Sequence, residues 1–301
     1  MLASLIARDP GFTQPVKDIS EPAYTIFTVL SALVLVGCMG YAARQWLTAR
    51  DGVPALFLAG GGICSLFEPL LDVNGGVWYP ATGGVAYLSL LDVRLPVFVL
   101  TSYIWIIGGQ AYLFWRALDQ RWPANRMWPL IGFVVVTDVV TEFIGVGLGA
   151  YGYYGNQPFE VLGFPLWYPF VNMVGPLLGA LVFLVLRDWL RGPRAVLGVL
   201  CVTIGMTAGY SVVGWPLWTG LQENAPLWVM YLLCAPTLLL AYLAVRLALT
   251  VAGTPGLNPS TELESDSDLA SVVQEPRAAD EAAGTRRPLS TARALRTREG
   301  T

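Results

Sequence analysis

The sequence predicts an all-α protein, a polytopic bundle of about seven transmembrane helices followed by a disordered C-terminal tail. Three observations support this prediction. Apolar residues make up 55% of the 301 residues and charged residues only 13%, and the mean hydropathy is +0.56, as is typical of membrane proteins. Apolar windows of about 20 residues, long enough to cross about 30 Å of hydrocarbon, recur along the chain. After Gly253 the composition becomes polar and charged.

The apolar windows set the expected domain boundaries. Residues 1–23 form an N-terminal segment in which Pro10, Pro15 and Pro22 leave no long apolar core. This segment does not resemble a cleavable signal peptide, so we expect the first span to remain in the mature protein. Residues 24–250 form the predicted transmembrane domain. Its spans are expected near residues 24–44, 53–71, 95–115, 127–149, 165–186, 195–216 and 226–249.

Residues 251–301 form the predicted tail. An acidic run, "ELESDSD", precedes the basic stretch "RRPLSTARALRTR". So few apolar residues cannot build a core, which predicts disorder. A solubilising role and contact of the basic stretch with anionic lipid both remain open interpretations.

Arginine placement predicts the orientation of the chain in the cell membrane. The positive-inside rule assigns arginine-rich loops to the cytoplasm, whereas the alternate loops contain only Arg94. We therefore expect a multi-pass protein with an external N-terminus and a cytoplasmic C-terminus. The arginines of the expected cytoplasmic side are Arg44, Arg50, Arg116, Arg121, Arg126, Arg187, Arg191, Arg194 and Arg246.

Several classes of site are excluded or disfavoured by the residues that the chain lacks. The sequence has no histidine, which excludes a Ser-His-Asp triad and a histidine-ligated haem. Its four cysteines fall in different expected spans without CxxC spacing, so we expect buried thiols, no metal and no disulfide framework. The only lysine, Lys17, precedes the first span, which rules out a retinal Schiff base in the last one. We expect no cofactor and no nucleic-acid partner.

Four carboxylic acids lie within or at the ends of the apolar spans. Glu68 and Asp72 are four positions apart in the second span, and Asp138 and Glu142 are four apart in the fourth. This spacing places both members of a pair on one face of a helix. A charge at the bilayer centre costs at least about 2.5–3.5 kcal/mol, so such residues usually face a cavity and have a function.

Both acid pairs are expected at similar depth, in the outer half of the membrane. The fifth span enters from that side and should bring Asn172 to the same level. We predict a shared pocket with Glu68, Asp72, Asp138 and Glu142 as catalytic residues. Its predicted substrate contacts are Asn74, Trp78, Tyr79, Tyr154, Trp167, Tyr168 and Asn172, and the linking loops also contribute Tyr151 and Tyr153. The alternative is that the acids are structural and that the aromatic residues form an interfacial belt.

Two kinds of chemistry suit paired acids. Aspartate motifs of membrane prenyltransferases hold magnesium diphosphate, but only Arg94 lies on the expected side to bind phosphate. Proton transfer fits better, because burial and mutual repulsion keep one carboxyl group protonated while a more solvated neighbour stays ionised. A transporter or lipid-binding protein would use the same acids as a proton relay.

Three motifs in residues 60–175 resemble the AveC spirocyclase family of actinobacterial membrane proteins. They are "EPLLDVNGGVWYP", "TDVVTEFIGVGLGAYGYYG" and "FPLWYPFVN". The Asp-Val-Val-x-Glu core of the second motif matches at Asp138 and Glu142. Family members carry Asp before Pro-Leu, where this chain has Glu68. They carry His-Glu in the third motif, where this chain has Trp167 and Tyr168, so any role of that histidine is absent.

The resemblance implies cofactor-free formation of a spiroketal, in some cases with dehydration, from a lipophilic polyketide. Ring closure needs an acid that helps water to leave and a base for the attacking hydroxyl group. We assign Asp138 as the general acid because it is the deepest, with Glu142 holding or relaying its proton. Glu68 and Asp72 would act as base or orient the substrate. The expected hydrogen-bond partners are Asn74 and Asn172.

The orientation leads to a first prediction. A reporter fused after Arg191 should be cytoplasmic and one fused after Asn156 external, because arginine-rich loops stay inside. Protease accessibility in intact cells measures both positions, and the reverse pattern would overturn the orientation.

Overall fold

The structure, a computed structural model, describes residues 12, 14–81 and 84–256. Within these residues seven helical segments are long and apolar enough to cross a membrane. The predicted all-α bundle is therefore confirmed, and the chain is a multi-pass membrane protein. The segments are Glu21–Ala49, Val53–Gly75, Val97–Asp119, Ala124–Gly147, Tyr168–Leu186, Gly192–Gln222 and Leu227–Val251.

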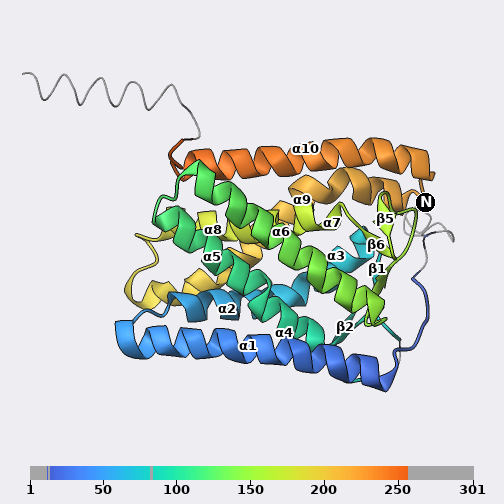
Figure 1. Ribbon diagram of the computed structural model, residues 1–301, viewed down its shortest axis with the longest axis horizontal. Helices are drawn as coiled ribbons and strands as arrows, with labels where there is room; N and C mark the ends of the chain where they lie inside the picture. Colours follow the sequence, from blue (N-terminus) through green and yellow to red (C-terminus); the bar gives the residue numbers. More distant parts are fainter. Residues whose placement is uncertain (1–11, 13, 82–83, 257–301) are drawn as a thin grey trace, which may run out of the picture. The chain divides into compact units, whose positions relative to one another are not determined.

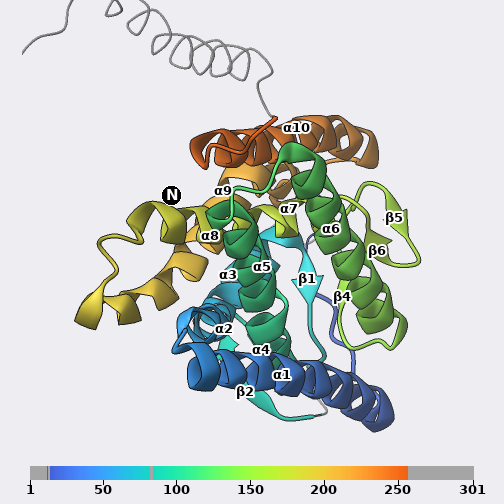
Figure 2. The ribbon, with the colours of Figure 1, turned by 60° about the vertical axis from the view of Figure 1, so that its left-hand side comes forward.

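Several of the spans are divided into shorter helices. The helices are α1 (Glu21–Ala49), α2 (Val53–Cys64), α3 (Glu68–Gly75), α4 (Val97–Trp105), α5 (Ile107–Asp119), α6 (Ala124–Gly147), α7 (Tyr168–Asn172), α8 (Val174–Leu186), α9 (Val199–Gln222) and α10 (Leu227–Val251), with the 3₁₀ segments η2 (Ser65–Phe67) and η3 (Gly192–Gly198). Figure 1 shows α1 and α10 at opposite edges of the bundle, and Figure 2 shows α4 and α5 between α1 and α6.

Short strands occupy the loops. They are β1 (Val77–Trp78), β2 (Ala86–Leu90), β3 (Val93–Pro96), β4 (Gly152–Tyr153), β5 (Glu160–Val161) and β6 (Phe164–Pro165). The antiparallel pairs are β1 with β4, β2 with β3, and β5 with β6. The β1–β4 pair joins the loop after α3 to the loop after α6, with Val77 opposite Tyr153 and Trp78 opposite Gly152. These two loops therefore form one layer beside the acid pairs.

A helix break positions the first acid pair. α2 ends at Cys64, and after η2 a new helix begins at Glu68, with Pro69 in its first turn. Proline is tolerated there because its missing N–H would have no helical partner. The break lies directly before Glu68, and α3 then places Asp72 one turn further on.

Small residues bring α8 and α9 into close contact. A Cβ atom on Gly205 of α9 would collide with the backbone nitrogen of Gly179 on α8. Glycines at such positions let transmembrane helices approach closely. The α8–α9 pair therefore depends on the absence of a side chain at Gly205.

The N-terminal segment packs on the loop layer. α1 begins at Glu21, inside the expected 1–23 segment, where the Ser20 side chain accepts a hydrogen bond from the nitrogen of Ala23. Phe12 is 1% exposed, and its ring centroid lies 4.7 Å from that of Tyr154. This part of the predicted 1–23 segment thus belongs to the fold.

The end of α10 is fixed to the start of α6. The backbone nitrogen of Ala124 donates a 2.8 Å hydrogen bond to the carbonyl oxygen of Pro255, and Thr254 is buried. The fold therefore extends to Gly256, into the expected 251–301 tail. The remainder of that predicted tail lies outside the described residues.

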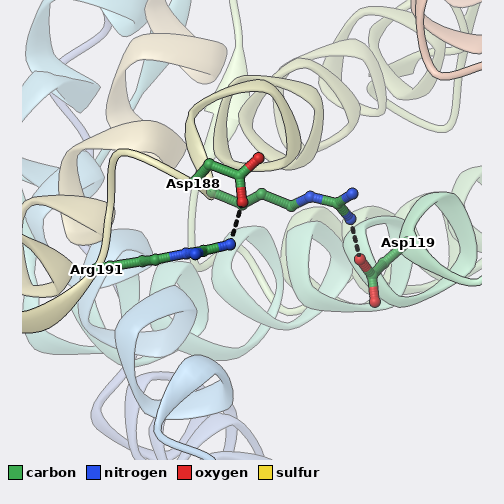
Figure 3. Close-up of polar contacts among 4 residues, drawn as sticks. Asp119, Asp188 and Arg191 are labelled. Atoms are coloured by element: carbon green, nitrogen blue, oxygen red, sulfur yellow. Dashed lines mark hydrogen bonds and ion pairs between the residues drawn. The ribbon is translucent and has the colours of Figure 1, made fainter.

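Charged contacts lie at the arginine-rich end of the bundle. Arg187, at the end of α8, donates a 2.8 Å hydrogen bond to Asp119 at the end of α5, and Arg191 pairs with Asp188 (Figure 3). All of these side chains are at least one-third exposed, so each pair contributes about 0–1 kcal/mol. These ion pairs lie at the exposed helix ends and contribute little to stability. The core consists of buried apolar side chains.

The α8–α9 contact leads to a second prediction. Gly205→Ala should lower the free energy of unfolding by about 1–3 kcal/mol, because the new methyl group overpacks a backbone contact. Gly132→Ala is the matched control, since its Cβ meets nothing within 4 Å. Thermal unfolding in detergent measures both variants, and equal midpoints would contradict the close contact.

Candidate functional site

The structure brings all four predicted acids to one cavity. Glu68 and Asp72 of α3 and Asp138 and Glu142 of α6 line a space of about 90 Å³. Three of them are buried, with 8% exposure for Glu68, 1% for Asp72 and 5% for Asp138, whereas Glu142 is partly buried. Two acid pairs from helices distant in sequence thus face a common volume.

Tyrosine hydroxyl groups hold Glu68. Tyr79 donates a 2.9 Å hydrogen bond to Oε1 of Glu68, and Tyr103 donates to Oε2. The carboxyl group of Asp72 is also hydrogen bonded to Glu68. Within the described part of the chain Oδ2 of Asp72 is buried without a partner. Asp72 thus has an unused acceptor oxygen beside the cavity that it lines.

A relay of side chains leads to Asp138. Nδ2 of Asn172 donates a 2.8 Å hydrogen bond to Oδ2 of Asp138, and Tyr210 donates to Oδ1 of Asn172. This fixes the amide of Asn172, because its oxygen accepts from Tyr210 while its nitrogen donates to the acid. The predicted partnership between Asn172 and the acid cluster is thus present in the structure.

Two loop tyrosines hold Glu142. Tyr153 donates a 2.7 Å hydrogen bond to Oε2 of Glu142, and Tyr151 also bonds to this carboxyl group. Burial, followed by the negative charge of Glu142, raises the pKa of both tyrosines. Burial likewise raises the pKa of Tyr79, with Glu68 adding to the effect. All three hydroxyl groups therefore keep their protons and act as hydrogen-bond donors.

A buried amide fixes the loops behind the cavity. Nε2 of Gln157 donates to the carbonyl oxygens of Gly75, at 2.9 Å, and Tyr154, at 3.0 Å. Its Oε1 accepts from Nε1 of Trp167 at 3.2 Å, and the hydroxyl group of Tyr168 donates to Gly75 at 2.7 Å. Gln157 thus ties together the end of α3 and the segments after α6. Sequence reasoning missed this residue because loop glutamines are common and nothing local marks it.

Only part of the predicted substrate-binding set lines the cavity. Tyr79, Tyr168 and Asn172 do so. Asn74 does not, because its amide donates a 2.7 Å hydrogen bond to the carbonyl oxygen of Leu70 in its own helix. Its predicted role as a partner of the substrate hydroxyl groups has no support in this geometry.

The other three predicted residues do not line the cavity, and backbone alternation accounts for two of them, Trp78 and Tyr154. Side chains along extended backbone point alternately to opposite sides, so Trp78, next to Tyr79, faces away and lies 5.3 Å from Nζ of Lys17. Tyr154 follows Tyr153 and packs on Phe12. Trp167 lies behind the cavity wall, stacked on Tyr168 with centroids 4.0 Å apart.

Four further tyrosines line the cavity. The loop residues Tyr151 and Tyr153 were expected near the pocket, whereas Tyr103 and Tyr210 were not predicted. The odd-numbered residues of "YGYY" share one face in extended backbone, which is the signal that distinguishes Tyr151 and Tyr153 from Tyr154. Tyr103 and Tyr210 lie inside apolar spans, where only a helical projection toward the acids would single them out.

The chemistry that these groups offer is proton transfer. Within residues 12, 14–81 and 84–256 no cluster of three or more His, Cys, Asp or Glu side chains is arranged to hold a metal ion. The cavity instead combines four carboxyl groups with hydroxyl donors. A search of protein-family models, curated proteins and solved structures found no match to this chain.

The Gln157 network leads to a third prediction. Gln157→Leu should lower the free energy of unfolding by about 1–3 kcal/mol, because buried carbonyl and indole groups lose their partners. Gln120→Leu is the control, since Gln120 is exposed and its side chain accepts a hydrogen bond from nearby Trp122. Chemical denaturation followed by tryptophan fluorescence measures both, and equal stabilities would show that the network contributes nothing.

Proposed function

We propose that the protein is an enzyme of the cell membrane that closes a lipophilic, polyketide-like substrate to a spiroketal by cofactor-free acid–base catalysis. The observation that carries this proposal is the convergence of two carboxyl pairs on one cavity lined by tyrosine hydroxyl groups. The resemblance of the three sequence motifs to the AveC spirocyclases supports the same activity. Lipophilic substrates partition into the bilayer, which gives a physical reason to place the site among helices.

The reaction removes one water molecule from a hydroxy-hemiketal. An acid protonates the hemiketal hydroxyl group. The bond between the hemiketal carbon and this oxygen then breaks, so that water departs and an oxocarbenium ion forms. The second hydroxyl group then attacks this carbon, and a base takes its proton. The proton that the base has taken returns to the acid before the next turnover, so the protein is regenerated without a cofactor.

Asp138 fits the role of acid. Among the described residues, its one side-chain hydrogen bond comes from Asn172, and the carboxyl group also lines the cavity. Asn172 holds the acid in place, and Glu142 lies one helical turn away, where it can return the proton.

Glu68 fits the role of base or fixed anion. Both of its oxygens accept hydroxyl protons, from Tyr79 and Tyr103, and hydrogen bonds of this kind stabilise the negative charge. A carboxylate beside the cavity also stabilises an oxocarbenium ion. The free oxygen of Asp72 is placed to accept a bond from the attacking hydroxyl group.

The fourth prediction tests this assignment. Asp138→Asn should reduce turnover of a linear dihydroxy ketone by about 100-fold or more, the scale of general acid catalysis, because the amide has no transferable proton. Asp138→Glu should retain more activity. The assay is product formation by purified protein, with monodisperse elution in detergent as the folding control.

Full activity in Asp138→Asn would remove Asp138 from the acid role and favour a structural one. The opposing function, a transporter or lipid-binding protein with a carboxylate relay, is distinguished in the same assay. A relay moves protons or ligand without forming a cyclised product. Absence of product with the wild-type protein across linear and hemiketal substrates would contradict the proposed function.

A further inference from the structure

A second, larger space lies beside the acid cavity. This groove has a volume of about 550 Å³ and is bounded by α1, α2, α5, α6 and the end of α4. Val34 of α1 and Phe133 of α6 are 44% and 56% exposed, so the groove opens on the surface that faces the bilayer. Its lining includes Val34, Gly37, Leu58, Gly109, Gln110 and Phe133.

Two glycines keep the groove open. A Cβ on Gly37 of α1 or on Gly109 of α5 would meet nothing within 4 Å. No turn or close helix contact requires glycine at these positions. The missing side chains leave room along the groove instead.

One polar side chain faces this apolar space. Gln110 is 8% exposed and lines the groove, and its amide has no hydrogen-bond partner among the side chains and backbone groups of the described residues. An amide that faces an apolar space without a hydrogen-bond partner carries a free-energy cost, because its polar atoms have lost water. Hydrocarbon alone cannot relieve that cost, whereas a chain that carries an oxygen atom can.

The groove and the acid cavity share a wall. Trp105 and Thr137 line the groove, and the next residues in the chain, Ile106 and Asp138, line the cavity. Nε1 of Trp105 donates a 3.1 Å hydrogen bond to Oγ of Ser31. That hydroxyl group lies 2.9 Å from Oγ of Ser102, which lines the cavity.

The two volumes differ in what they can hold. A cavity of about 90 Å³ is smaller than the roughly 300–1,000 Å³ of ordinary ligand sites. It can take the reacting carbon and its hydroxyl groups but not a long chain. The groove, at about 550 Å³, is large enough for the remainder.

We propose that the groove binds the hydrocarbon chain of the substrate, with an oxygen atom of that chain at the Gln110 amide, while the reacting end enters the acid cavity past Trp105. This assignment rests on the proposed function for the identity of the reacting end. The proposed occupant is a lipophilic chain that carries an oxygen atom and enters the groove laterally from the bilayer. An acyl chain of an ordinary membrane lipid is the competing occupant.

The test uses photolabelling, which needs no turnover. Wild-type protein in lipid nanodiscs is irradiated with a linear dihydroxy ketone that carries a diazirine on its alkyl chain. A phosphatidylcholine with the same diazirine chain serves as the comparison probe. The ketone should label peptides of α1, α5 and α6 that line the groove, and unlabelled ketone should compete.

Four glycine variants provide a matched set. Gly37→Leu and Gly109→Leu fill the groove and should reduce ketone labelling about tenfold. Gly40→Leu and Gly132→Leu, which also meet nothing within 4 Å and do not line the groove, should leave it unchanged. Gln110→Leu should weaken labelling by the ketone but not by a diazirine alkane of equal length.

Failure of the groove and failure of the proposed function are distinguishable. Asp138→Asn should keep wild-type labelling even though its turnover falls about 100-fold or more. Equal, non-competed labelling by phosphatidylcholine would mean that a bilayer lipid occupies the groove, and this would overturn the assignment. Unchanged ketone labelling in both Gly37→Leu and Gly109→Leu would overturn it as well.

Discussion

Carboxyl groups placed among apolar helices need polar partners, and the rest of the site follows from this requirement. Hydrocarbon cannot solvate a carboxylate, so hydroxyl and amide groups of the protein must do so. Glu68, Asp138 and Glu142 each accept at least one such hydrogen bond. The donors come from two loops and from the helices α4 and α7, through Tyr103 and Asn172, and Tyr210 of α9 donates in turn to Asn172. The acids thus connect distant parts of the chain.

The loop layer is the second consequence. Tyr79, Tyr151 and Tyr153 reach the acids only because β1 pairs with β4 and Gln157 ties the loops to the end of α3. A short strand pair is marginal in water, but here it is stabilised by the buried side chains around it. Precise placement of hydroxyl groups in an otherwise apolar bundle is what acid–base chemistry requires.

The parts of this structure that depend on a local sequence pattern, such as an apolar window or a four-residue spacing, were predictable from the sequence. Windows of apolar residues gave the seven spans, and the four-residue spacing of Asp138 and Glu142 placed both on one face of a helix. The aromatic residues were harder, because proximity in sequence does not determine the side on which a residue lies. Trp78 and Trp167 belong to the right loops but point away from the cavity, whereas their neighbours Tyr79 and Tyr168 line it. Gln157 and Tyr210 act through contacts between distant segments, which no local pattern encodes.

The proposed chemistry divides the ligand between two environments. The acid cavity is small and polar, whereas the groove between α1 and α6 is large and apolar. This division suits a substrate with one reactive end and a long chain. The third motif contains Trp167 and Tyr168 where the spirocyclase family has His-Glu, so the proposed function assigns the acid–base work to the four carboxyl groups. Tyr168 contributes a hydroxyl group that is already bonded to Gly75.

The central claim is that the four carboxyl groups perform ring closure together. The most direct test compares the wild-type protein with a variant in which Glu68, Asp72, Asp138 and Glu142 are all amides. Chiral chromatography measures the rate of spiroketal formation and its stereochemistry from one linear dihydroxy ketone. The account predicts a single stereoisomer from the wild-type protein, and only the slow, mixed background product from the variant. The same rate and the same mixture from both proteins would contradict it.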